Sequence, residues 1–483
     1  MELQWTKKPC TYLQTNVHQV MSQEQTQEIR LPEGMPDIGR VLSVWGQPVV
    51  RSKEWRGDGM SVSGGITASV LYLPEDGSTP RCAEGWIPFQ MKWSFPQSRR
   101  EGSIRTQCLL RSIDARTISA RKLMVRASVG VMGTAMEPAE ADVYVPGEVP
   151  EGVELLKKTY PLRLPREAGE KPFFLEEDVN LPGVQKWVSW QLQPELTEQN
   201  VVGNRAVFRG MGLLNYVYLD EEGNIKTGSQ EIPFAQFADL DRDYDKEASL
   251  DVMMEVSSLE PEVTDSGVRV QCGVTAQYLV WDRELLEVAE DAYSPRFALS
   301  VQQQSLQLPA ELERRTETLD AQTAFREGQV MDMTFLPDFP VQYREGEEIG
   351  LEFPAQFQML YQDGEGNLQC TTENWTGNMT LPAGENSQLS AHISGWRTMD
   401  SGARMKLKLL TLAKESIPMI TGLTVGEPKA QEQGRPSLIL RRMDADSLWE
   451  LAKDSGSTVS AIRKANHLTD EPAPGQMLLI PVS

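Results

Sequence analysis

The residue types that most often carry out chemistry in proteins are sparse in this chain. It has three histidines, His18, His392 and His467, which leaves little material for a Ser-His-Asp triad or a histidine-rich metal site. Residues 59–63 (Gly-Met-Ser-Val-Ser) begin like a nucleophile elbow but lack its closing glycine, and their alternating pattern is typical of a strand. The chain has no phosphate-binding loop of the G-x-x-x-x-G-K type. We therefore expect that the protein is not an enzyme. Carboxylate catalysis is the alternative that stays open, because 69 acidic residues always supply pairs of carboxylates.

Metal and redox chemistry are disfavoured as well. The acidic run 239–245 suggests calcium, but a calcium loop that starts at Asp239 needs Gly at its sixth place and Glu at its twelfth. The chain has Tyr244 and Leu250 there. The five cysteines are odd in number, widely spread and never spaced C-x-x-C, so neither a disulfide framework nor a zinc cage is indicated. The sequence predicts no metal and no cofactor.

Two residues near the C-terminus are better suited to binding than to catalysis. Trp449 lies one residue beyond the inner stripe of a helical pattern, at the edge of its apolar face. It either completes a small core or anchors an interface, a role in which Trp is enriched. His467 could stack on a ligand or form a hydrogen bond with it, although a lone loop histidine is more often solvated.

Four short elements within residues 436–483 must position these side chains. Apolar strands are expected at 437–440 and at 476–481, with two helical patterns between them. Pro474 and Gly475 turn the chain into the second strand. The expected order is therefore strand, helix, helix, strand.

The helix ends have recognisable capping residues. Asp446 or Ser447 caps the first helix, and Ser447 forms a capping box with Glu450. Gly456 supplies the left-handed stop, and Thr458 caps the second helix. The residues expected to point inward are Leu448, Leu451, Ala452, Val459, Ile462 and Ala465.

This βααβ order resembles the LysM domain. The residues at family positions are Leu448, Trp449, Leu451, Ala452, Asn466, Pro474, Gly475 and Gln476. The resemblance implies a ligand groove between the loops 443–447 and 467–472. The chain departs from the family at Ala445, where Gly is usual, and at Ser457, where an apolar residue is common. Loss of the permissive Gly disfavours a glycan, whose recognition needs close backbone approach.

From this resemblance we predict a partner- or glycan-binding site on the LysM groove and edge. Its candidate residues are Met443, Asp444, Ala445, Asp446, Ser447, Trp449, Asn466, His467, Leu468, Thr469 and Asp470.

The rest of the chain contains three similar passages, in each of which an apolar strand end runs into an acidic, Gly-containing turn. Their tyrosines, Tyr72, Tyr218 and Tyr361, are 146 and 143 residues apart, which suggests one domain per repeat. Residues 87–89 and 232–234 are both Ile-Pro-Phe and follow the first two turns, but the third copy lacks this signature.

Alternation of apolar and polar residues predicts a mainly antiparallel β body with a sandwich-like outline. Runs with this period of two include residues 123–131, 268–278 and 351–361. Short helices are expected only at 37–42 and 312–326. The predicted division is β domain 1 at 1–150, β domain 2 at 151–295, a divergent β domain 3 at 296–427, a linker at 428–435 and the LysM domain at 436–483.

The second copy, residues 202–234 and 291–295, resembles the SPOCS domain. Several such domains followed by a terminal LysM resemble a family of clostridial spore morphogenesis proteins. The resemblance implies a coat assembly scaffold in the mother cell, at the forespore surface. Its LysM would bind a protein partner, the coat morphogenetic ATPase. The alternatives are binding to peptidoglycan or another N-acetylglucosamine glycan and, more weakly, a hydrolase with a carbohydrate-binding tail.

Composition narrows the remaining partners. A formal charge of −22 over 483 residues disfavours nucleic acid and anionic lipid, because binding to either depends on Lys and Arg. No segment has the apolar length needed to cross a membrane, so we expect no membrane insertion. Glu2 directly follows Met1, and the N-terminal residues contain no apolar stretch, so they do not fit a signal peptide. We expect a cytoplasmic protein.

Overall fold

The structure is a computed structural model, and it describes residues 2–97, 101–181, 183–264, 267–382, 384, 387–429, 436–444 and 447–482. Over this part of the chain it is mainly β, with two short helices near the C-terminus. The predicted fold class is confirmed.

The strands fall into three consecutive blocks and a terminal module. The first block contains β1 (Trp5–Arg30), β2 (Ile38–Arg56), β3 (Gly59–Pro74), β4 (Arg81–Ser94), β5 (Ser103–Ser119) and β6 (Lys122–Pro146). The second contains β7 (Glu154–Asn180), β8 (Val184–Asp220), β9 (Ile225–Tyr244), β10 (Ser249–Thr264) and β11 (Gly267–Tyr293). The third contains β12 (Phe297–Gln322), β13 (Gln329–Pro337), β14 (Val341–Glu345), β15 (Glu348–Gln362), β16 (Leu368–Pro382), β17 (Ser387–Met399) and β18 (Gly402–Pro428). The terminal module contains β19 (Leu438–Arg442), α1 (Leu448–Ser455), α2 (Val459–Asn466) and β20 (Met477–Pro481).

Each sheet is built from the strands of a single block. The first block has the orders β1-β6-β5 and β2-β3-β4, and the second has β10-β11-β7 and β8-β9. The third has β12-β18-β17 and a four-stranded sheet around β15. In every block the first strand pairs antiparallel with the last. The predicted domain boundaries stay a prediction.

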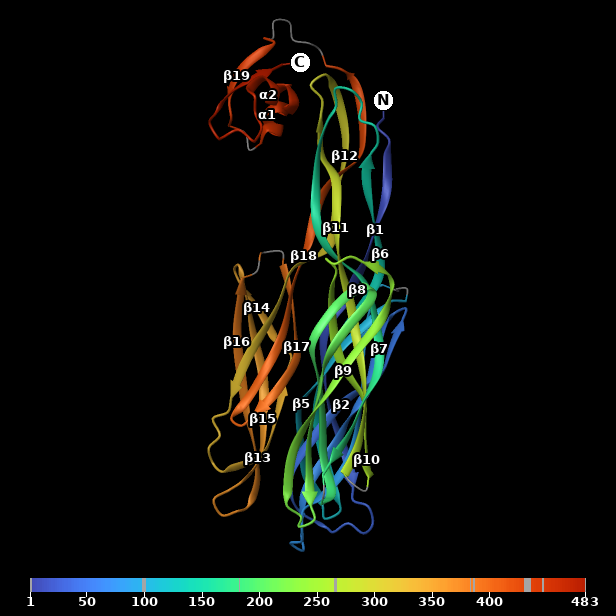
Figure 1. Ribbon diagram of the computed structural model, residues 1–483, viewed down its shortest axis with the longest axis vertical. Helices are drawn as coiled ribbons and strands as arrows, with labels where there is room; N and C mark the ends of the chain where they lie inside the picture. Colours follow the sequence, from blue (N-terminus) through green and yellow to red (C-terminus); the bar gives the residue numbers. More distant parts are fainter. Residues whose placement is uncertain are drawn as a thin grey trace.

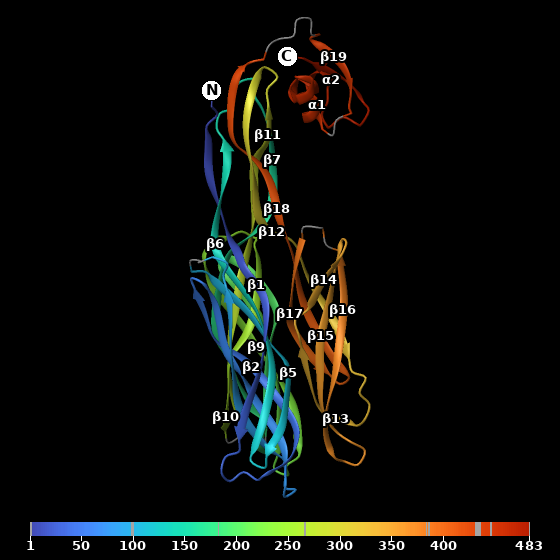
Figure 2. The ribbon, with the colours of Figure 1, turned by 180° about the vertical axis from the view of Figure 1, so that it is seen from behind.

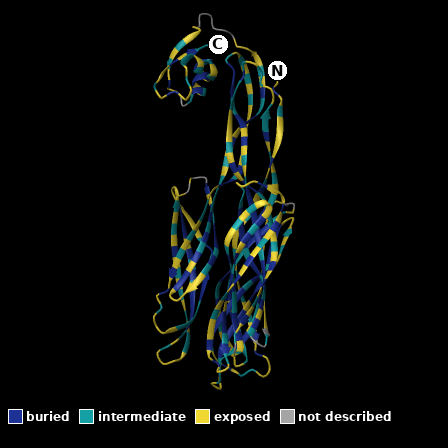
Figure 3. Cartoon of the chain, in the orientation of Figure 1, coloured by how far each residue is buried: buried dark blue, intermediate teal, exposed yellow. Residues whose placement is uncertain are grey.

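The alternating runs form the buried faces of these sheets. Leu123, Val125, Ala127, Val129 and Val131 on β6 are all fully buried, because successive side chains of a strand point to opposite faces. The equivalent run 268–276 on β11 is buried in the same way. Figure 3 shows buried positions concentrated in the wide lower part of the molecule.

The first and last strands of the blocks are long enough to extend beyond the lower part. Figure 1 shows them rising as a narrow stalk above two columns, one of which is formed by β13 to β17. The stalk has its own core, which contains residues from all three blocks. Examples are Val143 from the first, Val288 from the second and Met419 from the third. The three blocks therefore share a core in the stalk, whereas the wide part of the body has further hydrophobic clusters.

Glutamine side chains connect the blocks at sheet edges. The Gln358 amide on β15 donates to the carbonyl of Val44 on β2 at 2.7 Å. Gln47 on β2 accepts from the N–H of Leu192 on β8 at 2.9 Å. Edge strands present unpaired backbone groups, and these amides satisfy some of them.

Two short helices were expected in the body, and both predictions are wrong. Residues 38–42 are the first residues of β2, where Ile38 pairs with Pro74 on β3. Residues 312–322 belong to β12, which pairs with β18, and a bulge beside Glu311 leaves Leu312 exposed. Pairing with a long neighbouring strand outweighs the helix propensity of this Glu- and Arg-rich run.

Neither of the two helices seen in the described ranges is long and apolar enough to cross a membrane.

Candidate binding site

The terminal module folds through the capping residues that its sequence predicts. The Ser447 hydroxyl accepts a hydrogen bond from the N–H of Glu450 at 3.3 Å, which is one half of the predicted capping box. Gly456 ends α1 with φ at 64°, a left-handed conformation that favours glycine. Thr458 caps α2 by accepting from the N–H of Ala461 at 3.1 Å. These caps are confirmed, whereas the alternative cap Asp446 lies outside the described residues.

The inward-facing residues form a small core. Leu448, Leu451, Ala452 and Ile462 are fully buried, and they pack with the inner residues of β19 and β20. Val459 packs against this core from its margin.

The described candidates of the first loop differ in their exposure. Met443 is buried, and its backbone pairs with Gly475 and Gln476, so it is part of the core. Asp444 is exposed, and Ser447 caps α1. The candidates Ala445 and Asp446 lie outside the described residues.

The second loop holds the exposed candidates. His467 ends α2 with φ at 52° and is exposed, as are Thr469 and Asp470. Leu468 packs against the core. Sequence reasoning missed Glu471, whose carboxylate accepts from the N–H of Leu448 at 3.2 Å and so joins the two loops.

Asn466 has a structural role in the module. Its amide donates to the carbonyls of Ile462 (2.8 Å) and Leu479 (2.6 Å), and its oxygen accepts from the N–H of Leu479 at 2.7 Å. These bonds tie α2 to β20. The side chain therefore takes part in the fold of the module, and its role in ligand binding stays a prediction.

Trp449 contacts the β body of its own chain. Its indole N–H donates to the Asp291 carboxylate at 2.8 Å, and its ring meets Tyr293 edge-on, with the ring centroids 4.7 Å apart. Lys453, one turn further along α1, donates to the same carboxylate oxygen at 2.6 Å. Burial raises the pKa of Asp291, but the hydrogen bonds from Lys453 and Trp449 outweigh it, so the pKa lies below its usual value.

Sequence reasoning also missed an exposed aliphatic face on the module, formed by the outer side of the β19–β20 sheet. Leu438, Leu440, Met477 and Leu479 are 50%, 61%, 53% and 40% exposed, and Leu440 lies directly opposite Leu479. The alternate residues of both strands point into the core. We call these four residues the aliphatic face.

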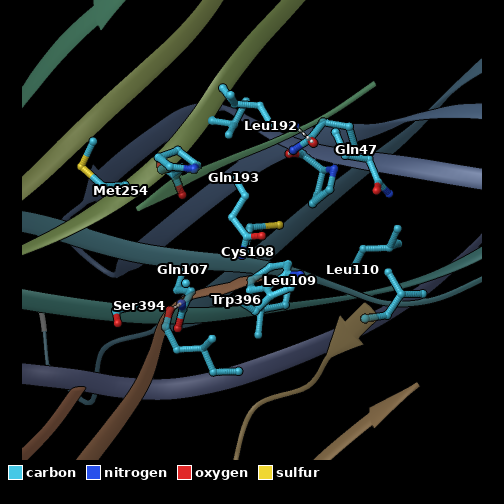
Figure 4. A pocket seen from close by; sticks show the side chains of 18 of the residues that line it. Gln47, Gln107, Cys108, Leu109, Leu110, Leu192, Gln193, Met254, Ser394 and Trp396 are labelled. Atoms are coloured by element: carbon cyan, nitrogen blue, oxygen red, sulfur yellow. Dashed lines mark hydrogen bonds between the residues drawn. The ribbon is translucent and has the colours of Figure 1, made fainter. Parts of the chain in front are cut away.

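A cavity of about 130 Å³ lies where the three blocks meet, and Figure 4 shows Gln107, Cys108, Gln193 and Trp396 around it. Burial raises the pKa of Cys108 well above its usual value, so its thiol is not an activated nucleophile. His392 also lines the cavity, and burial lowers its pKa to about 3, so it stays neutral. The cavity is large enough for a few ordered water molecules.

In the described parts of the chain, no group of three or more His, Cys, Asp or Glu side chains is arranged to hold a metal ion.

The geometry of the module is that of a small βααβ binding domain. Residues 445–481 match the LysM domain family, so the chain carries a LysM domain at its C-terminal end. This match supports a binding role for the module. No curated protein and no solved structure matches the chain.

Proposed function

We propose that the chain is a non-enzymatic assembly scaffold whose LysM domain binds a protein partner. The aliphatic face carries this proposal. Four large aliphatic side chains stand exposed on one small sheet. Such patches mark sites of protein interaction.

The chemistry of this face fits a protein better than a sugar. It has no aromatic ring for stacking, and its four side chains offer no hydrogen-bonding group. Arg442 is exposed on the same outer side of β19 and suits a carboxylate or carbonyl of the partner. The net charge of −22 disfavours an anionic membrane as the occupant.

The β body would serve as the rigid part of the scaffold. We propose that it comprises three SPOCS-like domains, 1–150, 151–295 and 296–427. Their shared stalk core and the interblock glutamine bonds would fix them relative to one another. Figure 2 shows the LysM domain beside the end of the stalk, at a distance from the wide part of the body.

The resemblance of the second repeat to the SPOCS domain supports a more specific role. With a terminal LysM, this organisation resembles the clostridial spore protein SipL. We propose that the chain acts in the mother-cell cytoplasm at the forespore surface. Its partner there would be the coat morphogenetic ATPase.

Co-purification tests this proposal. The full chain should retain the coat morphogenetic ATPase, and a chain without residues 436–483 should lose it. Equal recovery with both chains would contradict the proposed role of the LysM domain.

Glycan binding is the second candidate function, and the LysM match itself favours it. The exposed residues Asp444, His467, Thr469 and Asp470 would form the rim of the groove. The full chain should then sediment with purified peptidoglycan, and the chain without 436–483 should not. If the full chain stays in the supernatant, this candidate is excluded.

A further inference from the structure

The contact between α1 and the end of β11 is a built interface. Asp291 accepts from Trp449 and Lys453 with one carboxylate oxygen and from the N–H of Ala292 with the other. Tyr293 is only 6% exposed, and its side chain belongs to the same hydrophobic cluster as the LysM core. Lys429, which follows β18, also donates to the Ser294 carbonyl at 2.7 Å. A charged, an aromatic and a backbone contact therefore meet within four residues of β11 and the turn after it.

The first block has the same residues at the equivalent place but uses them differently. β6 ends in Asp142-Val-Tyr144-Val-Pro146, and β11 leads into Asp291-Ala-Tyr293-Ser-Pro295. In the first block, Lys7 on the adjacent strand pairs with Asp142 at 2.9 Å and lies 5.2 Å from the Tyr144 ring centre. The acid and the ring are thus satisfied within their own sheet.

The second block lacks that lysine. Lys7 is the register partner of Tyr144, and the register partner of Tyr293 is Glu154. Glu154 thus occupies the position that Lys7 has in the first block. An acid at this position of β7 cannot act as the cationic partner of Asp291 and Tyr293. Lys453 of the LysM domain supplies the cation instead, and Trp449, four residues before it on the same helix face, supplies the aromatic contact.

We propose that Asp291 and Tyr293 form a docking site for a helix face that presents Trp and Lys four residues apart, and that this site holds the LysM domain in one orientation. The inference goes beyond the proposed function, because it concerns how the domain is held and not what it binds. Figures 1 and 2 show β19 on the side of the module away from β11. The docked orientation therefore leaves the aliphatic face free.

Hydrogen exchange of the full-length chain tests the docking site. Asp291→Asn removes the charge that holds Lys453 and keeps a similar shape. We expect amide exchange in α1 to become roughly five- to thirtyfold faster, as expected for the loss of a contact of this kind. Asp142→Asn is the matched control, since it breaks the equivalent pair in the first block and should leave α1 unchanged.

The amides of β20 separate undocking from unfolding. Their exchange should stay slow in Asp291→Asn, because β20 keeps its hydrogen bonds to β19 and to Asn466 when α1 opens locally. The charge swap Asp291→Lys with Lys453→Asp should restore part of the protection of α1. The proposal is overturned if Asp291→Asn exchanges no faster than Asp142→Asn, or if β20 loses protection to the same extent as α1.

Discussion

Gln277 on β11 forms hydrogen bonds with both backbone groups of Thr106 on β5. Its oxygen accepts from the Thr106 N–H at 2.6 Å, and its nitrogen donates to the Thr106 carbonyl at 2.8 Å. β5 is the edge of its sheet, and both residues are fully buried. A side chain of the second block thus replaces the missing neighbour of an edge strand in the first.

Gln277→Leu should lower the free energy of unfolding by roughly 2–4 kcal/mol, because it leaves a buried N–H and a buried carbonyl unpaired. Urea unfolding measures this change. Gln271→Leu is the control on the same strand, since the Gln271 amide donates to the surface residue Glu176. Equal unfolding midpoints for the two variants would show that the Gln277 bonds add nothing to the body.

His392 makes the stability of the body depend on pH. Burial lowers its pKa from 6.5 to about 3; Asp251 opposes this shift, while Lys408, Arg105 and His18 add to it. The folded pKa lies below the unfolded one, so the unfolded chain takes up the proton first. The stabilisation is therefore complete above about pH 6.5 and falls by roughly 1.4 kcal/mol per pH unit below it.

His392→Gln should reduce this slope between pH 6.5 and pH 5, as measured by urea unfolding at each pH. His467→Asn is the control, because His467 is exposed and Asn tolerates its left-handed backbone. If His392→Gln keeps the full slope of the wild type, the buried imidazole is not its source.

Asn466→Ala should unfold the LysM module rather than weaken a ligand contact. The change removes two hydrogen bonds that join α2 to β20 and one within α2. We expect a loss of roughly 2–4 kcal/mol for the module. Faster hydrogen exchange in β20 measures it. If exchange is unchanged and ligand binding is reduced, Asn466 is a ligand-binding residue of the groove instead.

The parts of the fold that depend on local chemistry could be predicted from the sequence. Ser447, Gly456 and Thr458 act within one helical turn, and the alternation of residues 123–131 fixes which face of β6 is buried. The run 312–326 misled the prediction because a strand partner nearly a hundred residues away determines its structure.

The contacts of the candidate site could be predicted only in part. Trp449 was recognised as an interface residue or a core residue, but its partner Asp291 lies 158 residues earlier in the chain. Both faces of β19 and β20 are apolar in sequence, so periodicity alone cannot tell which of them stays exposed. The two helices cover one side of the β19–β20 sheet, and the aliphatic face is the side that they leave exposed.

The most direct test of the central claim is the affinity of the full-length chain for its proposed partner, the purified coat morphogenetic ATPase, measured by titration calorimetry. Leu440→Lys with Leu479→Lys places two charges on the aliphatic face without touching the core, and Thr469→Lys changes the groove rim as a control. We predict at least about a tenfold loss of affinity for the double variant, equal to about 1.4 kcal/mol, and little change for the control. Unchanged affinity of the double variant, with loss in Thr469→Lys, would contradict the account.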